Sequence, residues 1–124
     1  MKKIAIIGGG ISGLYFANLL QNNRKYEFKV FEKKAHFELN DGYGIQLSVN
    51  SIKLLNEIGF KNIEAHEISL PNKVNFYDAK SCKKICDIDI SKFNYENNCY
   101  TTLKRSTLLN FLLKNIPENK IILS

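Results

Sequence analysis

The sequence predicts an α/β fold with a parallel sheet and a small antiparallel excursion. Three observations support this: an apolar run is broken by three glycines, a segment with helical spacing follows, and an alternating strand comes next. The chain has 124 residues, of which 44% are hydrophobic and 24% are charged. These values are typical of a globular chain, and the length fits one domain or one incomplete domain.

The first third of the chain predicts a strand–turn–helix–strand unit. Lys3–Ile7 is a short apolar run, as expected of a buried strand. Ile11–Leu20 carries apolar residues at helical spacing, and Asn22 and Asn23 end that helix. Tyr26–Phe31 alternates with period two and predicts a second strand. The unit is about thirty residues long, which suits two parallel strands joined by a helix.

Shorter elements follow a polar loop from 33 to 44. Gly59 is expected at the C′ position of a helix and Pro117 beyond the end of another. The two strands flanking 78–81 predict an antiparallel pair. The expected elements are an extended piece at Ile45–Leu47, a helix at Asn50–Ile58, strands at Val74–Tyr77, Lys84–Ile90 and Asn98–Thr102, a helix at Ser106–Asn115, and a strand at Lys120–Leu123.

The glycines match the pattern G-x-G-x-x-G at Gly8, Gly10 and Gly13. The pattern alone is weak, but here it follows a strand and opens a helix, as dinucleotide binding requires. Gly8 would allow the tight turn, Gly10 would let a pyrophosphate approach the backbone, and Gly13 would let the helix pack closely on the sheet. The helix N-terminus would then offer free N–H groups to phosphates. A Rossmann-like region is therefore expected.

Glu32 ends the second predicted strand, 19 residues after Gly13. An acid at this place accepts hydrogen bonds from the ribose hydroxyls of a dinucleotide, and it argues against a 2′-phosphate. The simpler reading is a ligand-free glycine turn followed by an ordinary surface glutamate. Both FAD and NAD use this motif, so the choice between them depends on the sequence downstream.

Charge and composition exclude several other classes. The net charge is +6, but the lysines are scattered and only Arg24 and Arg105 are arginines, so we expect no nucleic-acid partner. No run approaches the ~18 apolar residues of a transmembrane segment. The three cysteines have no metal-ligand or disulfide spacing, which favours a reducing cytoplasm. Neither histidine has an evident acid–base partner, and no metal site is expected.

Three segments together resemble the FAD-dependent aromatic-ring hydroxylases, the class A flavoprotein monooxygenases, and especially their salicylate-hydroxylase-like branch. The first is Lys3–Leu14 with Phe31–Lys33, which holds the glycine motif and the acid. The second is Gly42–Gly59, similar to the glycine-Ile-x-Leu-x-x-Asn segment of that family and the helix after it. The third is Leu103–Leu113, similar to the family's Arg-x-x-Leu helix start. The resemblance makes FAD the expected dinucleotide.

The resemblance implies roles at matched positions only. The residues from the glycine motif would surround the FAD pyrophosphate, Glu32 would hold the ribose with Lys33 nearby, and Gly44 and Ile45 would run near the flavin ring. Arg105 would reach the phosphate and ribose region, although a solvated helix-terminal charge is the alternative. The expected cofactor-binding residues are Gly8, Gly10, Ile11, Ser12, Gly13, Glu32, Lys33, Gly44, Ile45 and Arg105. No catalytic side chain is expected among them.

The sequence departs from the family's pattern in two places and lacks two of its segments. Lys104 stands where many relatives have histidine, and Val49 stands where relatives usually have proline. The family's mid-chain Asp-Gly motif and later Gly-Asp motif are absent, as is a substrate domain. Residues 1–124 are therefore expected to be the N-terminal part of an FAD-binding domain, with the first strand left at an open edge. Alone, the chain is expected to bind FAD poorly or to be insoluble.

The activity implied for the parent protein is NAD(P)H-dependent hydroxylation of a small aromatic substrate by reduced flavin and O₂. Other FAD enzymes with this N-terminal architecture are alternatives, among them amine oxidases, halogenases and ubiquinone-ring hydroxylases. The segment Gly44–Gly59 argues against an amine oxidase but leaves a ubiquinone-ring hydroxylase open. A non-catalytic nucleotide-binding fragment is the alternative from a different class.

Overall fold

The computed structural model describes residues 1–40 and 42–124. These residues form two compact units. The first, which we call the glycine-turn unit, comprises residues 1–43 and 104–124. The second, which we call the hairpin unit, comprises residues 44–103.

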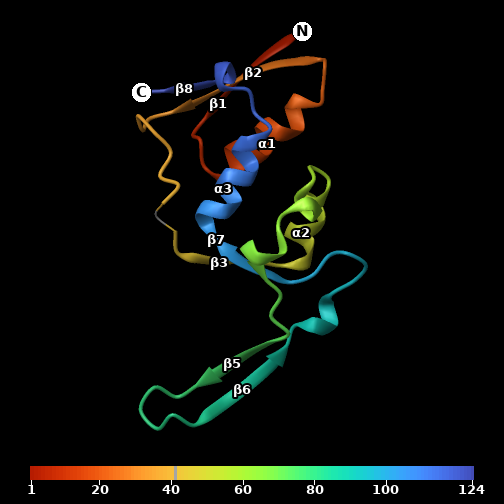
Figure 1. Cartoon of the computed structure of the whole chain (residues 1–124), viewed down its shortest axis with the longest axis vertical. Coiled ribbons are helices and arrows are strands. Elements are labelled where there is room, and N and C mark those ends of the chain that lie inside the picture. The colour runs from red at the N-terminus through yellow and green to blue at the C-terminus, as the bar shows by residue number, and fades with distance from the viewer. Residues whose placement is uncertain (41) are drawn as a thin grey trace. The chain divides into compact units, whose positions relative to one another are not determined.

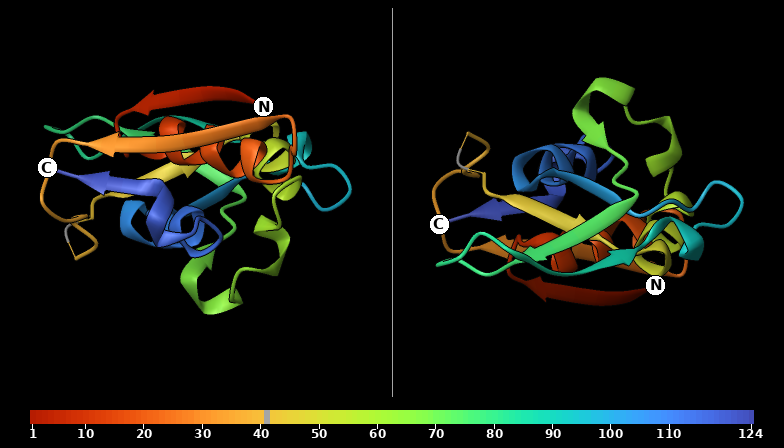
Figure 2. Two further views of the ribbon diagram at one scale, coloured as in Figure 1. Left: turned by 90° about the horizontal axis from the view of Figure 1, so that it is seen from above. Right: turned by 90° about the horizontal axis from the view of Figure 1, so that it is seen from below.

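A parallel sheet of three strands forms the base of the glycine-turn unit. Its strands are β1 (Lys2–Ile7), β2 (Tyr26–Glu32) and β8 (Ile121–Leu123), in the order β1–β2–β8. Both pairings are parallel, as the sequence predicts. Figure 2 shows the three strands, in red, orange and blue, side by side and pointing the same way.

Two helices pack together beside this sheet (Figure 1). They are α1 (Ile11–Gln21) and α3 (Arg105–Lys114), and a 3₁₀ turn at Glu118–Lys120 leads into β8. Asn22 caps the C-terminus of α1, which confirms the predicted end of that helix. The side chains buried most completely in this unit are Leu14, Ala17, Val30, Leu108 and Leu112.

A buried asparagine joins the two helices. The Asn18 side-chain amide donates one hydrogen bond to the Leu14 carbonyl and another to the Leu112 carbonyl, each at 2.8 Å. The second bond links α1 to α3 across 94 positions of sequence. A polar side chain in this position is stable only because its N–H groups find acceptors.

Apolar residues remain exposed along one row of the sheet. Ile7 aligns with Phe31, which aligns with Ile122, and all three side chains are more than a third exposed. Ile7 is 82% exposed. Among the described residues β1 pairs only with β2. Parallel sheets are ordinarily covered on both faces, so this row is unusual.

The hairpin unit contains a second small sheet and one helix. The sheet has the order β3–β7–β4, formed by Gly44–Leu47, Thr101–Lys104 and Ile68–Ser69. The helix is α2 (Val49–Asn56), followed by 3₁₀ turns at Phe60–Asn62 and Ala65–Glu67. The buried apolar side chains of the hairpin unit are Ile52, Leu55, Phe60, Ile90 and Leu103.

The predicted antiparallel excursion is a two-stranded hairpin within the same unit. Strand β5 (Lys73–Tyr77) pairs with β6 (Lys84–Asp89), and a 3₁₀ turn follows at Ser91–Phe93. The Asp78 carboxylate accepts hydrogen bonds from the backbone N–H groups of Lys80 and Ser81, at 3.2 and 2.6 Å, and so holds the connecting turn. All six residues of β6 are exposed.

Two sequence predictions were misplaced. The predicted helix Asn50–Ile58 ends at Asn56, because the next N–H groups bond three residues back in a tighter turn, as Ile58 does to Leu55. Gly59 still adopts the left-handed conformation, with φ +96°.

The strand predicted at Asn98–Thr102 was also misplaced, because β7 occupies Thr101–Lys104 instead. Side chains bind the backbone just before it. The Asn94 side chain accepts from the Tyr100 N–H at 2.8 Å, and the Thr101 hydroxyl donates to the Cys99 carbonyl at 2.8 Å. Such local bonds compete with strand pairing.

Candidate functional site

The glycine turn between β1 and α1 is built from backbone that side chains would disturb. Gly8 has φ +106°, a conformation that L side chains rarely adopt. Its N–H donates to the Phe31 carbonyl at 2.8 Å and so ties the turn to β2. A Cβ at Gly13 would lie 2.1 Å from the Gly8 carbonyl oxygen. The two glycines are therefore required by the fold itself.

Gly10 differs from Gly13 because the space beside it is empty, and it differs from Gly8 because its φ is negative. A Cβ built there meets no atom within 4 Å, and Gly10 begins α1 with no side-chain cap. Its carbonyl accepts the Leu14 N–H at 2.9 Å, the first bond of the helix. The N–H groups of Ile11, Ser12 and Gly13 lie in the first turn, where helices lack internal acceptors and carry partial positive charge.

Glu32 is positioned at the C-terminal end of β2, against this turn. Its carboxylate accepts the Gly9 N–H at 2.7 Å and the Lys34 N–H at 3.0 Å. These two bonds, the Gly9 bond foremost, lower the pKa of Glu32 below its ordinary value. The carboxylate is therefore ionised at neutral pH and can accept hydrogen bonds from hydroxyl groups.

A hollow of about 300 Å³ opens beside the glycine turn, within the glycine-turn unit. Gly10, Glu32 and Arg105 line it together. Arg105 is the first residue of α3, and its N–H donates to the Tyr43 carbonyl at 3.1 Å. The fold thus brings three predicted cofactor-binding residues from three separate elements to one place.

Charged side chains surround the same hollow. Lys34 Nζ lies 2.8 Å from Glu38 Oε2, and both side chains are about half exposed. The Lys34 hydrogen bond and charge, with smaller contributions from His36 and Arg105, lower the pKa of Glu38. The cations of this group would attract an anion such as a phosphate, while Glu32 provides acceptors.

The remaining predicted cofactor-binding residues do not line this hollow. Four of them belong to the turn and the first residues of α1: Gly8, Ile11, Ser12 and Gly13. Lys33 follows β2 and is exposed. The residues that line the hollow are Gly9, Gly10, Glu32, Lys34, His36, Phe37, Glu38, Tyr43, Arg105 and Leu109. Lys33 is not among them.

Gly44 and Ile45 begin β3 in the hairpin unit. Gly44 is exposed, with no atom within 4 Å of a Cβ built there, and Ile45 is half-buried. Their predicted place beside a flavin ring stays a prediction.

Sequence reasoning missed Gly9 and Phe37. Gly9 is buried, and a Cβ on it would lie 2.7 Å from the Phe37 ring. The available signal was the third consecutive glycine, because the motif leaves position 9 unspecified. Phe37 carried no signal, since a single aromatic residue in a polar loop matches no pattern.

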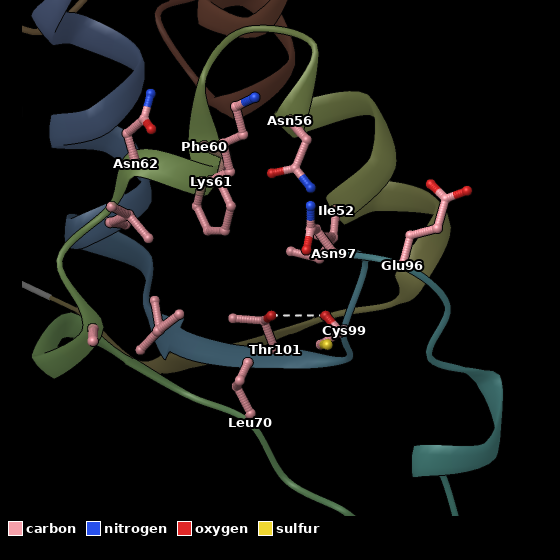
Figure 3. A pocket seen from close by; sticks show the side chains of 13 residues that line it. Ile52, Asn56, Phe60, Lys61, Asn62, Leu70, Glu96, Asn97, Cys99 and Thr101 are labelled. Carbon is pink, nitrogen blue, oxygen red and sulfur yellow. Dashed lines mark hydrogen bonds between the residues drawn. The ribbon is translucent and has the colours of Figure 1, made fainter.

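A larger hollow, of about 520 Å³, lies within the hairpin unit (Figure 3). Asn56, Phe60, Cys99 and Thr101 are among the side chains that line it. The dashed line in Figure 3 marks the bond from the Thr101 hydroxyl to the Cys99 carbonyl. No predicted cofactor-binding residue lines this hollow.

Comparisons with known proteins agree with the geometry. Residues 6–40 match the family model of the NAD(P)-binding Rossmann-like domain, a range that includes the glycine turn and Glu32. No curated protein matches the sequence. The chain therefore has a Rossmann-like α/β fold with a parallel sheet.

The solved structures similar to this chain include two hydroxylases and one oxygenase. The tetrameric form of 2-methyl-3-hydroxypyridine-5-carboxylic acid oxygenase is 18% identical to this chain, with a TM-score of 0.79. The match covers 100% of this chain and 31% of the oxygenase chain. 2,6-Dihydroxypyridine-3-hydroxylase from Arthrobacter nicotinovorans is 19% identical to this chain, with a TM-score of 0.74. The match covers 99% of this chain and 28% of the hydroxylase chain. The salicylate hydroxylase of a substrate complex is 18% identical to this chain, with a TM-score of 0.73. The match covers 99% of this chain and 28% of the hydroxylase chain.

These likenesses confirm the predicted fold class and agree with the family resemblance in the sequence. The chain spans less than a third of the length of those three enzymes. At 18% to 19% identity, these comparisons show that the chain shares the fold of those enzymes. In the described residues, no helix is long and apolar enough to cross a membrane.

Proposed function

We propose that the chain binds FAD as the N-terminal part of an NAD(P)H-dependent flavin monooxygenase that hydroxylates a small aromatic substrate. The observation that carries the proposal is the placement of Glu32, Gly10 and Arg105 around one hollow at the N-terminus of α1. This arrangement offers acceptors for a ribose and donors for a pyrophosphate. The hydroxylase fold and the three sequence segments favour FAD.

The residues present fit an adenine dinucleotide. The open space beside Gly10 would admit a pyrophosphate against the first-turn N–H groups of Ile11, Ser12 and Gly13. Glu32 would accept hydrogen bonds from the ribose hydroxyls, and the Arg105 guanidinium would pair with phosphate oxygens. By the family resemblance, Gly44 and Ile45 would run near the flavin ring, and Lys33 would lie near the ribose.

The chain would contribute binding and orientation, not a reacting side chain. Bound flavin would supply the redox chemistry that transfers one oxygen atom from O₂ to the substrate while NADH or NADPH is oxidised. Glu32 and Arg105 would fix the two ends of the ADP portion and so fix the direction in which the rest of the cofactor extends. The cysteine usage fits a cytoplasmic location for this activity.

A nicotinamide dinucleotide at the same site is the second candidate function. The matching family model is that of an NAD(P)-binding domain, and its range includes both Gly10 and Glu32. The ionised Glu32 carboxylate would repel the 2′-phosphate of NADPH, so NAD(H) is the form favoured here. Both candidates require the same ADP portion and differ in the remaining half of the ligand.

Titration of the full chain with FAD, NADH and NADPH tests these candidates. We expect FAD to bind more tightly than NADH, and NADH more tightly than NADPH, measured by ligand fluorescence. Arg105→Gln should weaken FAD binding about tenfold, because a charge-assisted bond to phosphate is lost. Arg24→Gln is the matched control, since Arg24 is the other arginine and is exposed.

Equal losses in the two arginine variants would remove Arg105 from the site, and NADH binding tighter than FAD would favour the second candidate. A soluble, folded chain that binds none of the three ligands, even weakly at millimolar concentration, would contradict both functions. Sequencing the coding region after Ser124 provides an independent test. A Gly-Asp motif in that region supports the hydroxylase assignment.

A further inference from the structure

Three groups meet at one point beside the glycine turn. A Cβ built on Gly9 would lie 2.7 Å and 3.0 Å from two atoms of the Phe37 ring, and 3.2 Å from the Glu32 Cβ. The Phe37 ring and the Glu32 stem therefore share the space that a side chain at position 9 would occupy. Only a glycine leaves room for the ring at this point, and Phe37 is half-buried there.

The same three residues are connected by the hydrogen bond that orients Glu32. Gly9 donates its N–H to Glu32 Oε2 at 2.7 Å, and the Phe37 ring packs against Gly9. The ring lies on the side of Gly9 where a Cβ would stand, so it limits the movement of the peptide that donates this bond. Glu32 and Phe37 also both line the 300 Å³ hollow.

We propose that Phe37 is a positioning residue that, through Gly9, holds the Glu32 carboxylate ready to accept a ribose diol. The proposal rests on the proposed dinucleotide-binding function and adds to it a determinant of ribose selectivity. Phe37 acts through Glu32, so its loss affects ligands that carry ribose hydroxyls more than ligands that lack them. A ring that served only to fill space would affect both kinds of ligand equally.

The experiment compares the binding of ADP with that of 2′,3′-dideoxy-ADP to the full chain by calorimetry. We expect the unchanged chain to prefer ADP about tenfold, because hydrogen bonds to a charged acceptor are lost with the hydroxyls. In Phe37→Ala the preference should fall to about twofold, since the carboxylate is no longer held in place. Phe37→Tyr keeps the ring and should keep the preference.

Two further variants keep the test decisive. Phe93→Ala is the matched control, because Phe93 lies in the hairpin unit and is more than half exposed, and it should leave the preference unchanged. If circular dichroism shows that Phe37→Ala fails to fold, Phe37→Leu removes the flat ring while keeping much of the bulk. The same loss of preference is expected for that variant.

A double-mutant cycle tests the contact itself. Gly9→Ala should lower the ADP preference by pushing the ring aside. The same substitution should have a smaller effect in a Phe37→Ala chain, where the ring is already gone. Additive effects would overturn the proposed coupling.

The remaining outcomes separate this proposal from the function on which it rests. An unchanged preference in Phe37→Ala, or an equal loss for both ligands, overturns the role of Phe37 and leaves nucleotide binding intact. ADP binding without any preference in the unchanged chain removes Glu32 as the ribose acceptor and overturns the proposal. Failure of the soluble, folded unchanged chain to bind ADP overturns the proposed function and this proposal together.

Discussion

The glycine turn and the β5–β6 hairpin are both short local structures, but they depend on their surroundings in different ways. At the turn, a Cβ on Gly13 would overlap the Gly8 carbonyl oxygen, and buried Gly9 touches Phe37. Along the hairpin, all of β6 is exposed and its ion pairs lie at the surface. Substitutions should therefore be costly at the turn and mild on the hairpin, because cost follows packing.

The largest effect is expected from Gly13→Ala. Its methyl group would lie 2.1 Å from the Gly8 carbonyl oxygen, and backbone cannot move aside as a flexible side chain can. We expect a loss of about 3 kcal/mol or more in the free energy of unfolding, measured by urea denaturation with circular dichroism. Gly10→Ala is the control, because its methyl group meets nothing within 4 Å. Equal losses in both variants would contradict the geometry of the turn.

Asn18→Leu should have the next largest effect. The substitution leaves the Leu112 carbonyl without the donor that now reaches it at 2.8 Å. An unsatisfied buried acceptor costs about 2 kcal/mol, so the urea midpoint should fall accordingly. Asn110→Leu, at an exposed position of α3, is the control and should change stability little. A midpoint unaffected by Asn18→Leu would show that the α1–α3 link contributes nothing.

The Glu32 carboxylate should make stability depend on pH. Its pKa in the folded chain is lowered from the ordinary 4.5, chiefly by the Gly9 N–H bond. The stabilisation is therefore present above pH 4.5 and is lost as the pH falls through the lowered folded value. Glu32→Gln should lose less stability than the unchanged chain between pH 7 and pH 3, measured by thermal melting. Identical pH profiles would show that the Gly9 bond is not formed in solution.

The smallest effect is expected on the hairpin. Ile88 is 47% exposed and lies opposite Val74. Ile88→Thr keeps a β-branched side chain in the strand, so stability should change by about 0.5 kcal/mol or less. Solubility should rise, measured as the concentration that stays in the supernatant after centrifugation. A loss as large as that of Asn18→Leu would show that the hairpin is packed in solution, and would remove the contrast between the two regions.

Much of the glycine-turn unit could be predicted because its signals are local. The alternation of Tyr26–Phe31, the spacing of the glycines and the place of Glu32 each follow from a few neighbouring residues. The predicted strands and helices of this unit were found within one or two residues of their expected ends. Arg105 was predicted from a family resemblance, and the structure brings it to the hollow with Glu32.

Boundaries and strand positions in the hairpin unit were harder to predict. The helix expected to reach Ile58 ends at Asn56, and the strand expected from Asn98 begins at Thr101. In both places the backbone forms tight turns or binds a nearby side chain, as Asn94 does with Tyr100. Such local competition is not visible in the spacing of hydrophobic residues. A polar residue fits that spacing equally well whether its side chain faces solvent or binds the nearby backbone.

The sequence by itself determined the parallel βαβ unit, the glycine turn and the acid that faces it, because glycine requirements and periodicity act over neighbouring positions. Only the tertiary structure decided that Asn18 joins two helices, that Phe37 packs on Gly9 beside Glu32, and that the row from Ile7 to Ile122 stays exposed. These features depend on residues far apart in the chain. Their contacts are set by how the elements pack, and no local pattern specifies that packing.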